Sequence, residues 1–174
     1  MPAELNTAHT PCTEQSRRAT SETRDARKLI WFLVPSYDIA NGGIMSICRF
    51  HAETDRLLSS RGVTVVASTY PNAQTLRKYT RFENSMEIFS FAEIITHFNS
   101  VEHVILHIPE YFCKDFLSCL SLAERLFLDT IPRLHINIML QNIDFCGRDD
   151  ITPLRALTNE ITCTTAHDRY STEE

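Results

Sequence analysis

The sequence predicts an α/β domain with a doubly wound, mostly parallel, Rossmann-like sheet that carries helices on both faces. Short, uninterrupted apolar runs recur along the chain, as is typical of strands that are buried on both faces. Segments with apolar residues at helical spacing separate these runs, so that strand and helix alternate roughly six times. Such alternation builds a parallel sheet through right-handed crossovers, which place helices on both faces.

Residues 1–27 precede this pattern, and they are rich in Thr, Ser, Glu and Arg without hydrophobic periodicity. They cannot bury enough apolar surface to offset the entropy of ordering, so we expect a disordered tail. The Rossmann-like domain is expected over residues 28–174. Its first strand is the apolar run 29–34, which ends at Pro35.

The remaining elements follow the same two patterns. Apolar runs predict further strands over 63–67, 86–89, 101–106, 135–140 and 161–164. Helical spacing predicts helices over 44–59, 91–98 and 152–159, and one or two helices over 110–130. The stripe of the first helix that is expected to face the core comprises Ile44, Ile47, Cys48, Ala52, Leu57 and Leu58. The inward side chains expected from 110–130 are Phe112, Phe116, Leu117, Leu120, Leu126 and Phe127.

Composition argues against several functional classes. The formal net charge of -5 does not fit a nucleic-acid-binding module, because such modules carry a basic surplus. The six cysteines include no C-x-x-C pair and no spacing of zinc ligands, so we expect free thiols, a reducing cytoplasmic setting and no metal. No apolar run approaches the ~18 residues of a membrane span, and the N-terminus does not resemble a signal peptide.

The first candidate site follows the first strand. Only four glycines occur in the chain, and two of them, Gly42 and Gly43, are adjacent here. Together with Asn41 they precede a predicted helix, whose free N–H groups favour an anion such as a diphosphate. Ser36 and Asp38 in the same loop are candidate substrate ligands. A plain turn is the alternative, because no dinucleotide or P-loop fingerprint is present.

Three further candidates follow later strands. His107 and Glu110 could supply a general base and a hydrogen-bonding group, although Glu110 could equally favour a helix start and His107 could be structural. Gln141 and Asn142 could bind sugar hydroxyls or instead form a turn. His167 is a candidate substrate ligand, with a helix cap as the alternative.

The stretch Ile30–Asp38, followed by Gly42, Gly43 and Ile44, resembles the opening of GT-B glycosyltransferases. It is most similar to the N-terminal domains of the glycosyltransferase family 4-like and rhamnosyltransferase-type enzymes. The blocks 140–144 and 161–165 are similar to later parts of such domains. The resemblance covers roughly residues 28–170.

This resemblance implies two Rossmann-like domains facing each other across a cleft. The first mainly holds a glycan or lipid-linked acceptor, and the second mainly holds the nucleotide-sugar donor, without a metal. Gly42 and Gly43 match the turn near the donor diphosphate, and His107 or Glu110 matches an active-site residue after the fourth strand. The second domain has no room in 174 residues, so we expect this chain alone to be inactive and to need that domain or a partner chain.

Two other functions stay open on the sequence. One is a non-catalytic α/β binding or interaction module related to such enzymes. The other is a receiver domain, which would need clustered acidic residues after the first strand, where only Asp38 is found.

Overall fold

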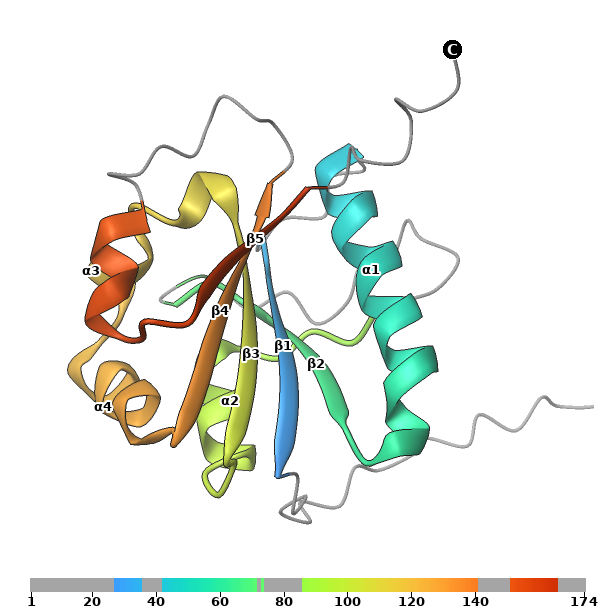
Figure 1. Ribbon diagram of the computed structural model, residues 1–174, viewed down its shortest axis with the longest axis horizontal. Coiled ribbons are helices and arrows are strands. Elements are labelled where there is room, and N and C mark those ends of the chain that lie inside the picture. Colours follow the sequence, from blue (N-terminus) through green and yellow to red (C-terminus); the bar gives the residue numbers. More distant parts are fainter. Residues whose placement is uncertain (1–26, 36–41, 72, 74–85, 141–150, 166–174) are drawn as a thin grey trace, which may run out of the picture.

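The computed structural model describes residues 27–35, 42–71, 73, 86–140 and 151–165. Five strands form one sheet in the order β2-β1-β3-β4-β5, and every neighbouring pair is parallel (Figure 1). The strands are β1 (Lys28–Val34), β2 (Thr64–Thr69), β3 (His103–Pro109), β4 (Arg133–Leu140) and β5 (Ile161–Thr165). The parallel sheet is confirmed, whereas the predicted tail lies outside the described residues except for Arg27.

The strand predicted over 86–89 is reduced to isolated bridge positions at Glu87 and Phe89. Phe89 forms an isolated parallel bridge with Ser68 of β2. Its N–H donates to the carbonyl of Ala67 at 3.0 Å, and its carbonyl accepts from the N–H of Thr69 at 2.9 Å. Because β1 occupies the other edge of β2, the bridge extends the strand order to that of a Rossmann fold, 3-2-1-4-5-6.

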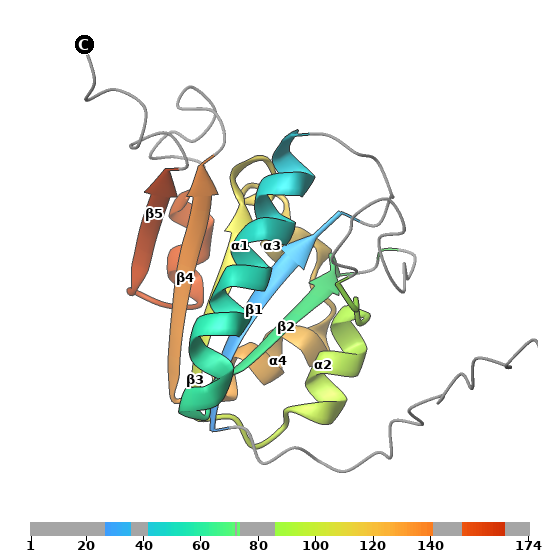
Figure 2. The same cartoon turned by 90° about the vertical axis from the view of Figure 1, so that its right-hand side faces the viewer.

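Helices cover both faces, as predicted. The helix α1 (Gly42–Leu58) packs on one face, and α2 (Phe91–His97), α3 (Phe116–Cys119) and α4 (Leu122–Thr130) pack on the other (Figures 1 and 2). Short 3-10 helices are η1 (Ser59–Arg61), η2 (Glu110–Phe112) and η3 (Thr152–Ala156). Of the one or two helices expected over 110–130, the structure has two α-helices, α3 and α4, which η2 precedes.

Residues of β1 feed two separate cores. Leu29, Trp31 and Leu33 join the core under α2, α3 and α4. The intervening Ile30, Phe32 and Val34 join the core under α1. All six are buried, because neighbouring side chains of a strand point to opposite faces and both faces are covered.

Capping boxes fix the starts of two helices. Ser90 accepts from the N–H of Glu93, whose carboxylate accepts from the N–H of Ser90. Ser121 and Glu124 make the same reciprocal pair at the start of α4. Each box satisfies donors that the first helical turn leaves unpaired.

Two predicted core residues are exposed. Leu126 is 55% exposed, because α4 begins anew at Leu122 and its phase buries Glu124 and Leu128 instead. Leu57 is 51% exposed, and its neighbour Leu58 packs against the core under α1. The prediction of inward positions is wrong for these two side chains.

The four cysteines that the structure describes are all free thiols, in agreement with the sequence. Cys48 and Cys113 are buried, whereas Cys163 on β5 is exposed. No helix within the described ranges is long and apolar enough to cross a membrane.

We predict that Ser68→Ala lowers the free energy of unfolding by about 1–3 kcal/mol. The indole N–H of Trp31 donates to Oγ of Ser68 at 2.6 Å, and both residues are fully buried. Alanine would leave the indole N–H without a partner. Urea unfolding followed by the fluorescence of this single tryptophan measures the loss. The exposed Ser60→Ala is the control, and equal stability of both variants would contradict the prediction.

Candidate functional site

The structure describes four of the ten predicted site residues. They are Gly42, Gly43, His107 and Glu110. The others, Ser36, Asp38, Asn41, Gln141, Asn142 and His167, lie outside the described residues, and their roles stay predictions.

The two glycines begin α1. Gly42 is the first residue of this 17-residue helix, and the chain reaches it from the end of β1. The start of α1 lies on the side toward which the strand arrows point (Figure 2). The start of α1 therefore lies at the carboxyl edge of the sheet, with the partial positive charge of the helix dipole at that end.

An aromatic group lies at the same edge. Tyr70 follows β2, Tyr111 belongs to η2 after β3, and their hydroxyl groups are in contact. The ring of Tyr70 stacks on Phe112, with centroids 3.9 Å apart and planes within 9°. Because β1 lies between β2 and β3, the two tyrosines meet beyond the end of β1. Tyr111 remains 42% exposed, whereas the adjacent Glu110 is buried.

The sequence predicted His107 beyond the end of its strand, but the structure places this residue inside β3. The strand continues to Pro109, because residues 107–109 pair with 137–139 of β4. Its imidazole stacks on Phe32, with centroids 4.3 Å apart and planes within 5°, and the edge of Phe50 packs beside it. His107 therefore faces the α1 side of the sheet.

Asn137 fixes the protonation pattern of His107. Its Oδ1 accepts from the hydroxyls of Thr162 at 3.3 Å and Thr164 at 2.9 Å. Its Nδ2, which can only donate, lies 2.9 Å from Nδ1 of His107. Nδ1 is therefore an acceptor, and the proton of the neutral ring is on Nε2.

The low basicity of His107 follows from the same surroundings. Burial is the main reason that its pKa falls from 6.5 to about 4, and the charge of neighbouring His135 contributes. The ring of His107 is therefore neutral at pH 7, and the lone pair on its Nδ1 accepts a hydrogen bond from Asn137. This arrangement favours hydrogen-bond donation from Nε2 over the predicted role as general base.

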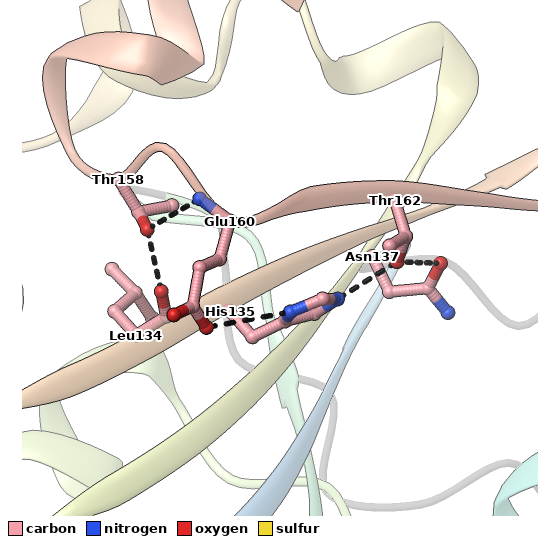
Figure 3. Close-up of polar contacts among 6 residues, drawn as sticks. All are labelled: Leu134, His135, Asn137, Thr158, Glu160 and Thr162. Atoms are coloured by element: carbon pink, nitrogen blue, oxygen red, sulfur yellow. Dashed lines mark hydrogen bonds and ion pairs between the residues drawn. The ribbon is translucent and has the colours of Figure 1, made fainter.

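The polar chain continues from Asn137 to the first residues of the β5 segment (Figure 3). The Thr162 hydroxyl donates to Asn137. The same hydroxyl oxygen lies 2.8 Å from Nε2 of His135 and therefore accepts a hydrogen bond from its N–H. The other ring nitrogen of His135 lies 3.7 Å from the carboxylate of Glu160. Five side chains, Glu160, His135, Thr162, Asn137 and His107, therefore form one continuous chain across β3, β4 and β5.

A turn before β5 places Glu160 beside His135. The Thr158 hydroxyl donates to the carbonyl of Leu134 at 2.6 Å and accepts from the N–H of Glu160 at 3.0 Å (Figure 3). The backbone of Glu160 also accepts from the N–H of Ile136. The carboxylate is thus held at the start of β5 by contacts with β4.

A cavity of about 760 Å³ opens over this polar chain. Its walls include His107, His135, Asn137, Glu160 and Thr162, and Leu58 at the end of α1. Figure 2 shows α1 crossing the sheet beside β4 and β5, which no helix of the described chain covers on this face. The predicted partner Glu110 is not among the described residues that line it.

Sequence reasoning missed this cavity. The available signal was the alternation of Arg133, His135 and Asn137 along β4, which places three polar side chains on one face. Their meeting with His107 depends on the strand register, which the sequence does not reveal. Among the described residues, no group of three or more His, Cys, Asp or Glu side chains could hold a metal ion.

Comparisons with known proteins identify no family. No family model matches the chain, and no match was found among curated proteins or solved structures.

We predict that acidification destabilises the domain through His107. Because its pKa is about 4 in the folded state and near 6.5 when unfolded, the unfolded chain binds more protons below pH 6.5. The free energy of unfolding is therefore highest above about pH 6.5 and falls as the pH decreases toward 4. At pH 5 it is lower by about 2 kcal/mol. Urea unfolding at pH 7 and pH 5 measures the difference.

His107→Gln is expected to reduce this pH dependence, whatever its effect on stability at pH 7. Burial also lowers the pKa of His51, an effect that Asp55 partly offsets, so some pH dependence should remain. His97→Gln on α2 is the matched control. Parallel pH profiles for the wild type and His107→Gln would refute the assignment.

Proposed function

We propose that this chain forms the acceptor-side domain of a GT-B-type glycosyltransferase, which moves a sugar from a nucleotide-sugar to a glycan or lipid-linked acceptor. The observation that carries the proposal is the divergence of the chain after β1 and β3. These strands are neighbours, but β1 leads into α1 on one face and β3 leads into α3 and α4 on the other. Ligands of open α/β sheets bind in the crevice at such a point.

The start of α1 supports a phosphate-binding role at this edge. Two glycines without side-chain bulk begin the helix, so a ligand could approach the backbone closely. Partial positive charge at the helix tip favours the diphosphate that leaves when a nucleotide-sugar reacts. In this proposal a second domain binds the nucleoside.

The aromatic group supports a sugar-binding role at the carboxyl edge of the sheet. Tyr111 is partly exposed, and its hydroxyl contact with Tyr70 and the stacking of Tyr70 on Phe112 hold the group together. A tyrosine combines a flat apolar face with a polar hydroxyl, which suits the apolar faces and hydroxyl groups of a sugar ring.

The cavity favours the second candidate, a non-catalytic α/β binding module. It lies over the sheet face, and its β1 lining, Lys28 to Ile30, comes from the amino end of that strand. A ligand bound there would not contact the helix tip. The two candidates therefore predict different ligand positions.

We predict that nucleoside diphosphates bind the chain weakly, on the order of 1 mM, and that Gly43→Val weakens binding about tenfold. The valine side chain would obstruct the approach to the helix tip. Calorimetric titration with UDP, GDP and dTDP measures the affinities. Thr54→Val, which places the same side chain farther along α1, should leave them unchanged.

Two results would reject the sugar-transfer proposal. One is that none of the three diphosphates binds. The other is that Gly43→Val and the wild type bind them with equal affinity. Transfer of sugar should require a nucleotide-sugar-binding domain, so sugar transfer by the 174-residue chain alone would contradict the assignment of this chain as one half of the enzyme.

A further inference from the structure

The register of the strands arranges the floor of the cavity in three rows. Lys28, His103 and Arg133 are aligned across the amino ends of β1, β3 and β4. Residues that pair in register share a face, so these three basic side chains form one row on the α1 side. All three line the cavity.

The second row is apolar over β1 and β3. Ile30 and Ile105 are paired in register, and His135 continues the row on β4. Ile105 remains 39% exposed, although β3 is a central strand with neighbours on both sides. Leu58 at the end of α1 and Val63 just before β2 add apolar wall.

The third row consists of three members of the polar chain. His107, Asn137 and Thr162 are aligned across β3, β4 and β5. Since alternate residues of a parallel strand are about 7 Å apart, the basic row and the polar row are separated by about 13 Å. The cavity thus presents positive charge, then apolar surface, then hydrogen-bonding groups along one direction.

The charges of the cavity differ from those of the chain. Lys28 and Arg133 are exposed cations, and Glu160 is the single carboxylate among the described residues that line the cavity. Glu160 lies at the β5 side, next to His135. The lining is therefore more positive than a chain with a formal net charge of -5 would suggest, which favours an anionic ligand.

We propose that this cavity binds a small amphipathic oxyanion, a carboxylate or phosphate attached to an apolar chain. The acid group lies at the basic row of Lys28, His103 and Arg133, and the apolar chain covers Ile30 and Ile105. The volume of about 760 Å³ suits a small molecule rather than a protein segment. This site is separate from the carboxyl edge and does not depend on the proposed sugar transfer.

Octanoate is the first probe, because it combines a carboxylate with a flexible apolar chain. Acetate retains the charge without the chain, and 1-octanol retains the chain without the charge. Octyl phosphate distinguishes a phosphate-bearing source from a carboxylate-bearing one. Calorimetry with the full chain should show saturable binding of octanoate, octyl phosphate or both, and weaker binding of acetate and octanol.

Arg133→Glu is the decisive variant. It reverses an exposed charge at the rim, and it should weaken octanoate binding about tenfold or more while changing octanol binding little. Arg155→Glu makes the same change on η3, whose Leu154 packs in the core on the opposite face. This control variant should bind octanoate as the wild type does.

Ile105→Glu tests the apolar row by placing a carboxylate on it, and it should abolish binding of both chain-bearing anions. If this variant does not fold, Ile105→Ala replaces it and should weaken octanoate more than acetate. Failure of both anions to bind, equal binding of octanoate and octanol, or equal effects of Arg133→Glu and Arg155→Glu would overturn the proposal.

Discussion

Burial of β1 on both faces is the constraint on which the rest of the structure depends. Residues 29–34 supply three side chains to each of two cores, and β2 and β3 pair with both edges of the strand. Helices must therefore cover both sides of β1, which the connections of a doubly wound sheet achieve. The same central position brings the end of β1 between those of β2 and β3, where α1 begins and the tyrosines meet.

The sequence located the five strands of the sheet, since a strand that is buried on both faces has a continuous apolar run, but it also predicted a strand over 86–89. It was less informative where the sheet is covered on one side. In β4, Leu134, Ile136 and Ile138 pack in one core, and the intervening His135 and Asn137 are polar. His107 was expected after its strand for the same reason, since a polar residue interrupts the apolar run although the ladder continues to Pro109.

The candidate sites differ in how far local sequence could reveal them. The adjacent glycines indicated the start of α1, because a position between a strand and a helix can be recognised from the local sequence. The chain from Glu160 to His107 joins residues up to 53 positions apart, and it depends on the register of three strands. The boxes at Ser90 and Ser121 match the pattern Ser-x-x-Glu in the sequence, and the second explains why a separate helix begins at Leu122 within 110–130.

Polar residues on a half-covered sheet face must be satisfied or they destabilise the fold. Asn137 provides these hydrogen bonds, because its side-chain amide accepts from two threonines and donates to His107. With the amide engaged on both sides, the imidazole is held neutral against Phe32, where a charged ring would lose solvation. The network thus makes polar side chains on this face compatible with a packed sheet.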